Sequence, residues 1–306
     1  KYEIVEVLDG DGNEGSHVSF SAPAKVGENV RSAAEEAHAG DVVMRAGEVV
    51  APAGAGLLAS AGYASVKGHA APRVGIISLG TELVAPSKVP ARGQIRDSNS
   101  SALMAEALDA GAEPVFYGIA PDDERAIAEL VHRAVQECDF VITSGGASAG
   151  DYDYVTALVR REGEVLFDRI STRPGKAITF GLLAGKPYLG LSGNPAAAYV
   201  GFEMLARPAI RKMRGFAEGA RPVQRAVLTH SVKKRQDRRF FDRATVSRDP
   251  ETGELLVTEA KTQNSALLGT MQRANCLLRI DEGPCDLKAG DVVDVVRVDL
   301  PEGTVL

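Results

Sequence analysis

A glycine- and serine-rich loop is the segment of this chain best suited to binding a ligand. Residues 143–153 read TSGGASAGDYD and follow a short apolar run. Glycine leaves the backbone N–H groups of such a loop open to a phosphate or another anion. The segment fits neither G-x-x-x-x-G-K-[ST] nor G-x-G-x-x-G, so a tight turn capped by Asp151 remains an alternative. The predicted anion cradle comprises Gly145, Gly146, Ser148, Gly150 and Asp151.

Two further turns carry polar groups of the same kind. Arg173 and Lys176 place two cations within the turn Arg-Pro-Gly-Lys. A second turn, at 191–195, joins an apolar run to a helical pattern, and its proline suits the first position of a helix. Simple helix capping is the alternative for this turn. Its candidate ligand-binding residues are Ser192, Gly193, Asn194 and Pro195.

Four acidic residues follow predicted strands or begin predicted helices. Carboxylates beside a phosphate cradle favour a hard divalent cation, because Mg²⁺ bridges carboxylate and phosphate oxygens. Capping at the surface is the alternative for each residue taken singly. The predicted acidic and metal-binding group is Glu82, Asp97, Asp122 and Asp153.

The elements that must position these loops are apolar strands alternating with amphipathic helices. Residues 74–79, 114–119 and 140–144 are short apolar runs typical of strands buried on both faces of a parallel sheet. Helical patterns at 98–110 and 122–136 separate them. Two successive strand-helix-strand units predict a doubly wound α/β/α domain with its ligand loops at one edge of the sheet.

The regions on either side have a different texture. Upstream, strand alternation at 2–8 and 17–22 precedes a helical stretch at 26–38, which predicts a mixed α+β domain. A last helix at 196–213 is followed by five short alternating runs, which predict a small β-barrel domain. The predicted domains are 1–72, 73–217 and 218–306.

Composition excludes several classes of protein. The 306 residues carry a net charge of -6, which argues against a nucleic-acid binder. There is no apolar run of 18 residues and no secretory signal pattern, so neither a membrane span nor export is expected. Three cysteines without a C-x-x-C pair favour reduced thiols in the cytoplasm. Because the sequence begins without Met and in an apparent strand, we expect it to be part of a longer protein.

Taken together, the motifs resemble those of the molybdopterin molybdenumtransferases, the family of the MoeA proteins and the E domain of gephyrin. The resemblance rests on TSGGASAGDYD, RPGKAITFG and GLSGNPAAA, with LGTEL and GQIRDSN before them. It implies a homodimeric enzyme of molybdenum cofactor synthesis. Such an enzyme inserts molybdate into adenylylated molybdopterin and releases AMP with the help of Mg²⁺.

The resemblance also implies roles for individual residues. The 145–151 loop would bind the pterin phosphate, the four acids would serve catalysis and hold the metal, and Arg173 and Lys176 would face molybdate. Arg238 and Thr270 from the β domain would join the same pocket, and Glu36 would reach the site of the partner subunit. This chain departs from the family where Arg-Pro-Gly-Lys replaces Lys-Pro-Gly-Lys, because arginine makes planar, bidentate contacts.

Two other functions remain open at this point. The sister family of molybdopterin adenylyltransferases shares the central domain, although those proteins need neither the upstream region nor the β domain. A noncatalytic pterin-binding or scaffold protein is the other alternative. The sequence does not distinguish molybdate from tungstate, since both are tetrahedral dianions.

Overall fold

The computed structural model describes residues 25–28, 30–146 and 154–304, together with four two-residue strands nearer the N-terminus. These are β1 (Tyr2–Glu3), β2 (Val7–Leu8), β3 (Glu14–Gly15) and β4 (Ser19–Phe20). The chain forms two compact units, Lys1–Val66 and Lys67–Leu306. The described residues contain no helix long and apolar enough to cross a membrane. The boundaries of the three predicted domains stay a prediction.

The described residues of the upstream unit contain one helix, and it does not lie where the sequence predicts it. The described part of 26–38 forms turns, whereas helix α1 spans Pro52–Ser60. Gly27 and Ala34 have positive φ angles, which interrupt a right-handed helix. Pro52 has the fixed φ that suits the beginning of a helix, and the alanines that follow favour helical backbone. The prediction of a helix over 26–38 is therefore wrong.

The second unit is built on a six-stranded sheet with the order β10-β12-β13-β9-β5-β8. Strands β5 (Arg73–Leu79), β8 (Glu113–Ala120), β9 (Phe140–Ser144) and β13 (Lys186–Leu191) are parallel. Strands β12 (Ala177–Leu183) and β10 (Gly163–Arg169) continue the sheet antiparallel. After β5 the chain pairs β8 on one side and then β9 on the other, so the direction of winding changes between β5 and β9.

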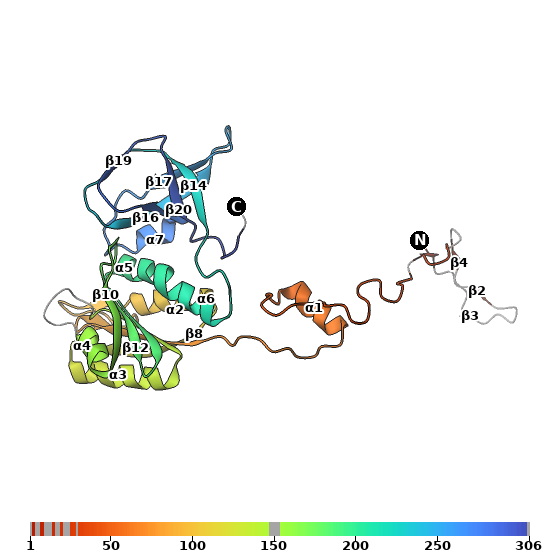
Figure 1. The fold of residues 1–306 in the computed structure, drawn as a ribbon, viewed down its shortest axis with the longest axis horizontal. Helices are drawn as coiled ribbons and strands as arrows, with labels where there is room; N and C mark the ends of the chain where they lie inside the picture. Colours follow the sequence, from red (N-terminus) through yellow and green to blue (C-terminus); the bar gives the residue numbers. More distant parts are fainter. Residues whose placement is uncertain are drawn as a thin grey trace. The chain divides into compact units, whose positions relative to one another are not determined.

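Helices cover both faces of this sheet. Helices α3 (Glu124–Glu137) and α4 (Tyr154–Glu162) lie on one face, while α2 (Asn99–Asp109), α5 (Pro195–Gly201) and α6 (Arg207–Met213) cover the face toward the β domain (Figure 1). Two separate apolar clusters fill the layers. The predicted doubly wound α/β/α architecture is confirmed. The largely apolar strands β5 and β9 form its centre because their side chains are buried on both faces.

The predicted helix over 196–213 is present but interrupted. A π-helical turn, η1 (Phe202–Ala206), separates α5 from α6, and the N–H of Arg207 bonds the carbonyl of Phe202. Pro208 follows and has no N–H to donate to the turn before it, so the regular i to i−4 pattern cannot continue there. The interruption thus has a local cause in the sequence.

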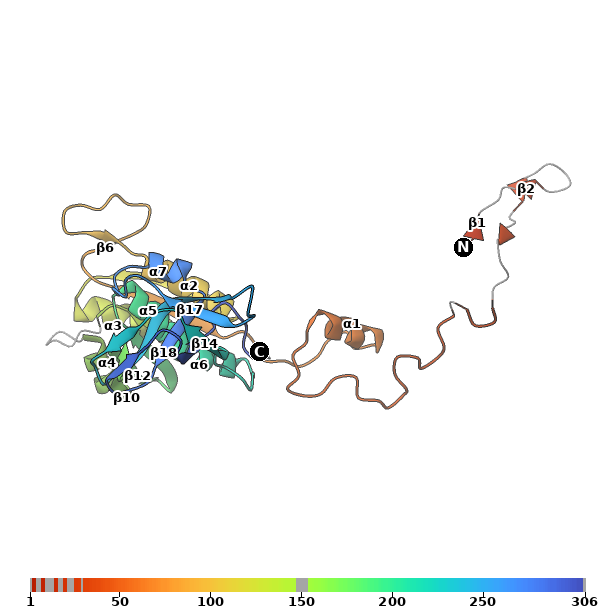
Figure 2. The same cartoon turned by 90° about the horizontal axis from the view of Figure 1, so that it is seen from above.

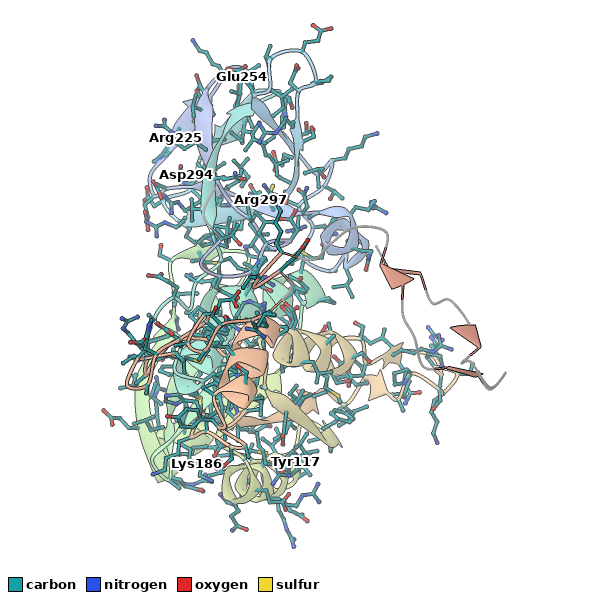
Figure 3. The ribbon with its side chains drawn as sticks, turned by 90° about the vertical axis from the view of Figure 1, so that its right-hand side faces the viewer. Tyr117, Lys186, Arg225, Glu254, Asp294 and Arg297 are labelled. Carbon is teal, nitrogen blue, oxygen red and sulfur yellow. The ribbon has the colours of Figure 1, made fainter. Side chains whose placement is uncertain are left out.

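The end of the sheet far from the β domain is held by one lysine. Lys186 donates from Nζ to the carbonyl oxygens of Val135 at 2.7 Å and Cys138 at 2.8 Å, at the end of α3. Its charge complements the negative end of the helix. Figure 3 shows Lys186 and Tyr117 at this end, and Arg225 among the strands at the opposite end.

The C-terminal region forms a five-stranded barrel. Strands β14 (Val223–Leu228), β16 (Arg239–Arg248), β17 (Leu255–Glu259), β18 (Cys276–Ile280) and β20 (Val292–Val296) pair in a ring that β16 and β18 close. Beside it lie the pair β15 (Val232–Lys234) and β19 (Cys285–Leu287) and the short helix α7 (Gly269–Arg273). The predicted β barrel is confirmed.

Two short segments connect the layers to the loops at the sheet edge. Strand β11 (Thr172–Arg173) runs parallel to β16, so the Arg-Pro-Gly-Lys turn begins against the barrel. Strands β6 (Leu83–Val84) and β7 (Ile95–Arg96) pair with each other, and the loop between them projects from this unit (Figure 2). Both segments lie close to the predicted ligand loops.

Candidate functional site

The loops after β9 and β13 meet at the edge of the sheet. The N–H of Gly145 donates to the carbonyl of Leu191 at 3.0 Å, and the Oγ of Ser144 donates to the carbonyl of Ser192 at 3.4 Å. The amide of Asn99, at the start of α2, donates to Ser144 Oγ at 2.7 Å and to the Gly193 carbonyl at 2.9 Å. The two glycine loops are therefore held together by hydrogen bonds from three elements.

Glycine is required at position 145 for steric reasons. Its φ is +92°, and a Cβ there would lie 2.1 Å from the carbonyl oxygen of Leu79, at the end of β5. A Cβ on Gly146, with φ +70°, would lie 2.8 Å from a methyl of Leu79. The loop after β9 thus folds directly onto the end of β5. Since the Gly145 N–H already bonds Leu191, this glycine acts by shaping the loop.

The remainder of the predicted cradle lies outside the described residues. This applies to Ser148, Gly150 and Asp151, and also to Asp153 of the predicted acidic group. Their roles stay predictions.

The Arg-Pro-Gly-Lys turn lies at the same edge of the sheet as the two glycine loops. A Cβ on Gly175 would lie 3.4 Å from the carbonyl oxygen of Ala197, so the Arg-Pro-Gly-Lys turn packs on the first turn of α5. The N–H of Ala196 donates to the carbonyl of Ser265 at 2.9 Å, which places a loop of the β domain there as well. Lys176 is exposed and has no ion-pair partner among the described residues. Its ammonium group is available to an anionic ligand.

The second turn contributes mainly backbone. Asn194 precedes α5 without a side-chain capping bond, and its N–H donates to Ser192 Oγ at 3.3 Å. Pro195 is the first residue of the helix, as its type predicts. Gly193 and Asn194 are both exposed. An approaching ligand therefore meets exposed backbone and an amide at this turn.

The predicted acidic group is only partly brought together. Asp122 accepts from the Thr81 N–H at 3.2 Å and the Thr81 hydroxyl at 3.1 Å, and the Glu82 carboxylate folds over Gly80. These two acids share the loops after β5 and β8. Asp97 instead is 2% exposed and lines a groove beside α2. The described residues contain no group of three His, Cys, Asp or Glu arranged to hold a metal.

The β-domain residues named by the resemblance differ in their surroundings. Thr270 is buried, donates to the Leu267 carbonyl at 2.8 Å and accepts from Arg243 Nε at 3.2 Å. Arg238 is half-buried and donates to Gln236 at 2.5 Å, one residue before β16 pairs with β11. Among the described residues, neither side chain donates to or accepts from the glycine loops.

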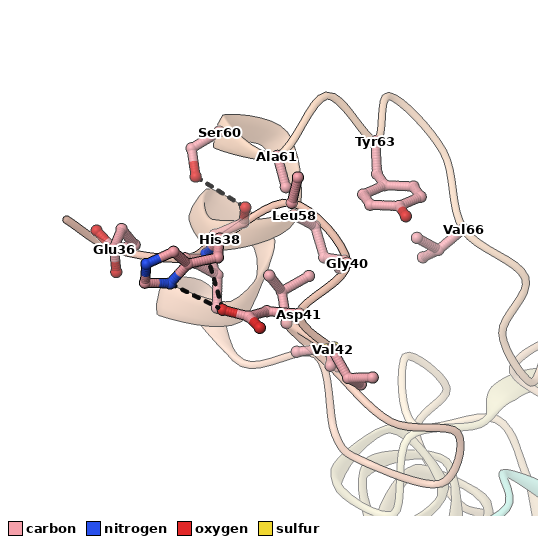
Figure 4. Close-up of a pocket in the computed structure, with 15 residues that line it drawn as sticks. Glu36, His38, Gly40, Asp41, Val42, Leu58, Ser60, Ala61, Tyr63 and Val66 are labelled. Carbon is pink, nitrogen blue, oxygen red and sulfur yellow. Dashed lines mark hydrogen bonds and ion pairs between the residues drawn. The ribbon is translucent and has the colours of Figure 1, made fainter. Parts of the chain in front are cut away.

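Glu36 belongs to the upstream unit, which we describe by itself. It is exposed and lies 3.4 Å from Arg31. With His38 and Asp41, which form an ion pair at 3.5 Å, it lines a pocket of about 650 Å³ (Figure 4). Whether it reaches a partner subunit stays a prediction.

Comparisons with known proteins agree with this architecture. Residues 75–212 match the family described as probable molybdopterin binding domain, and 225–298 match the MoeA C-terminal region, domain IV. The chain is 34% identical to the molybdopterin molybdenumtransferase of Bacillus subtilis over 297 residues, which cover 97% of this chain and 68% of that protein. This chain belongs to the molybdopterin molybdenumtransferase family.

Further relatives give the same result. The molybdopterin molybdenumtransferase of Staphylococcus aureus strain COL is 34% identical over 90% of this chain, and the match spans 65% of that relative. The chain therefore spans about two thirds of the length of the relatives it matches. A crystal structure of a molybdopterin biosynthesis MoeA protein from Pyrococcus horikoshii superposes with a TM-score of 0.72 at 30% identity, covering 84% of this chain and 62% of that one.

This member of the molybdopterin molybdenumtransferase family holds the first cation of its Arg-Pro-Gly-Lys turn in an ion pair with a buried carboxylate. Both carboxylate oxygens of Asp242 accept from Arg173 Nη2 at 2.7 Å, and the guanidinium lies 3.5 Å from the centre of the Phe240 ring. Burial raises the pKa of Asp242, and Arg173 opposes that shift. Arg173 therefore links the turn to the barrel, which leaves Lys176 as its exposed cation.

Two residues that hold these loops in place, Asn99 and Asp242, were not predicted from the sequence. Asn99 is part of GQIRDSN, but its role as a bridge between loops depends on contacts 45 and 94 residues away. Asp242 had a visible signal, because it is a lone acid among the inward-facing residues Phe240, Ala244 and Val246 of β16. A charge at such a position requires a partner.

Proposed function

We propose that this chain inserts molybdate into adenylylated molybdopterin and releases AMP, as a step of molybdenum cofactor synthesis. The observation that carries the proposal is the meeting of the β9 and β13 loops with the Arg-Pro-Gly-Lys turn at one edge of the sheet. Relatives that are 34% identical carry the name molybdopterin molybdenumtransferase. The match to the MoeA C-terminal region favours insertion over adenylylation.

In this proposal each part of the edge has one task. The half-buried backbone at Gly146 and the exposed backbone at Gly193 bind the phosphate portion of the substrate, because N–H groups at glycine can approach phosphate oxygens closely. The ammonium of Lys176 binds the molybdate dianion and neutralises its charge. Arg173 positions the turn through Asp242.

Magnesium fits the described residues as an ion shared with the substrate. Mg²⁺ is commonly bound by one or two carboxylates together with substrate phosphates. Glu82 and Asp122 provide two carboxylates at neighbouring loops, with Asp122 already oriented by Thr81. Bound there, the ion would neutralise phosphate charge. We further propose that the protein is a homodimer, as the family resemblance implies, and that it is cytoplasmic, which is consistent with the free thiols of its three cysteines.

Release of AMP tests this function. The purified protein is incubated with adenylylated molybdopterin, molybdate and Mg²⁺, and AMP is measured over time. Lys176→Ala should reduce the rate by about two orders of magnitude, the usual effect of removing one group that stabilises developing charge. The control is Lys212→Ala, an exposed lysine on α6, which should behave as the unaltered protein. Equal rates for both variants would contradict the assignment.

A further inference from the structure

A groove of about 810 Å³ follows one side of α2 in the unit Lys67–Leu306. The groove side of the helix is a stripe at helical spacing, formed by Ser98, Ser101, Ala102, Ala105 and Glu106. Residues of η1, α7 and the segment after β20 form the other walls. Between the two ends of the groove, this helix surface therefore carries only small, uncharged side chains.

Two buried carboxylates in this groove keep oxygens without a hydrogen-bond donor. Asp97 is 2% exposed and Glu106 is 6% exposed. Asp97 Oδ1 accepts from the Ser100 N–H at 3.1 Å, whereas Asp97 Oδ2 and both carboxylate oxygens of Glu106 accept no hydrogen bond from the described residues and have almost no contact with solvent. Buried carboxylates are normally paired, because an unpaired one loses its hydration without compensation. A ligand that brings hydrogen-bond donors would remove this deficit.

The charge of the groove determines the kind of ligand. Its lining has five carboxylates and two guanidinium groups. Three of these carboxylates are ion-paired: Asp109 and Glu203 with Arg221, at 2.9 and 3.0 Å, and Asp299 with Arg297 at 2.8 Å. Only Asp97 and Glu106 keep buried oxygens without a donor among the described residues of the groove. These acceptors favour a cation that carries N–H donors.

The spacing of the unpartnered carboxylates specifies the shape of that cation. Asp97 lies two residues before the start of α2, and Glu106 lies nine residues further along, which corresponds to about 13 Å at 1.5 Å per residue. Serine and alanine between them leave room for a methylene chain. We propose that this groove binds a linear polyamine, with one ammonium group at Asp97 and another at Glu106. Asp97, which the sequence predicts in the metal-binding group, has a different role here, while Lys176, Glu82 and Asp122 of the proposed function are not part of the groove lining.

Binding should also release a proton. Burial, followed by repulsion from Glu203 and Asp109, raises the pKa of Glu106 well above its usual value, while Arg207 and Arg221 lower it. Tyr199, which also faces the groove, has a raised pKa and stays neutral. An ammonium group at Glu106 stabilises the ionised carboxylate and so displaces its proton. The measured heat of binding should therefore depend on the ionisation enthalpy of the buffer.

Isothermal titration calorimetry with spermidine and putrescine tests the proposal on the full chain. Spermidine should bind at least tenfold more tightly than putrescine, because the shorter diamine cannot reach both carboxylates. Glu106→Gln should weaken spermidine binding by roughly tenfold or more, since a charge-assisted contact is lost. Ala105→Leu fills the groove from an exposed helix position and should abolish binding.

Glu254→Gln is the matched control. Glu254 is an exposed acid on the barrel side of this unit, far from α2 (Figure 3), and its replacement should leave the affinity unchanged. If Glu106→Gln does not fold, Ala105→Leu still decides the question. No binding of spermidine, equal affinity for both amines, or unchanged binding in Ala105→Leu would each overturn the proposal.

Discussion

Replacing Gly145 with alanine tests how the loop after β9 is built. The added Cβ would lie 2.1 Å from the carbonyl oxygen of Leu79, well inside contact distance, and φ is +92°. Because the obstacle is backbone at the end of β5, a side-chain rotation cannot relieve it. The loop must move away from the strand, and the hydrogen bond from the Gly145 N–H to Leu191 is then strained or lost.

Three glycines allow the magnitude to be estimated. Gly253 has φ +74° and open space around it, so alanine there costs only the left-handed backbone conformation, about 1 kcal/mol. At Gly146 the nearest atom is a methyl of Leu79 at 2.8 Å, which can move, so about 2 kcal/mol is expected. At Gly145 the conformational cost, the displaced backbone and one weakened hydrogen bond together give about 3 kcal/mol or more.

Urea denaturation of the three alanine variants measures these differences. All three substitutions should lower the free energy of unfolding. The loss should be smallest for Gly253→Ala, larger for Gly146→Ala and largest for Gly145→Ala. Gly145→Ala should also reduce AMP release, whereas Gly253→Ala should not. If Gly145→Ala is no less stable than Gly253→Ala, the loop does not pack on β5 as described.

Three further outcomes follow from particular contacts. Asn99→Ala removes two hydrogen bonds and should lower the free energy of unfolding by about 1 to 2 kcal/mol; no loss would contradict its bridging role. Asp242→Asn leaves Arg173 without its buried anion and should cost about 2 kcal/mol in urea denaturation, whereas increased stability would contradict the pairing. Burial raises the pKa of Cys276 to about 12, so at pH 8 iodoacetamide should alkylate half-buried Cys285 first; mass spectrometry showing the reverse order would contradict this.

Local patterns predict the central sheet because the energetics there are local and repetitive. The apolar runs of β5 and β9 match burial on both faces, and Asp123 caps α3 as expected for an acid before a helix. The helix at Pro52–Ser60 is missed because its many glycines and alanines resemble a loop. The sequence patterns also do not predict strands β10 and β12.

The site depends more on contacts between distant segments. The convergence of loops at strand ends follows from topology, which explains why the Gly145 and Gly193 turns could be placed together. The partners of charged side chains could not be predicted from topology in this way. Arg173 was expected to face molybdate, but its partner Asp242 lies 69 residues away, and Asp97 is buried beside α2. The position of a long polar side chain depends on the partner that the fold brings to it.

The position of a bound oxyanion tests the central claim most directly. Crystals soaked in tungstate, whose tungsten scatters anomalously, would locate the anion without reference to turnover. We predict a tungsten peak in contact with the ammonium of Lys176, between the loops after β9 and β13. Tungstate ordered only at other positions on the chain would contradict the account.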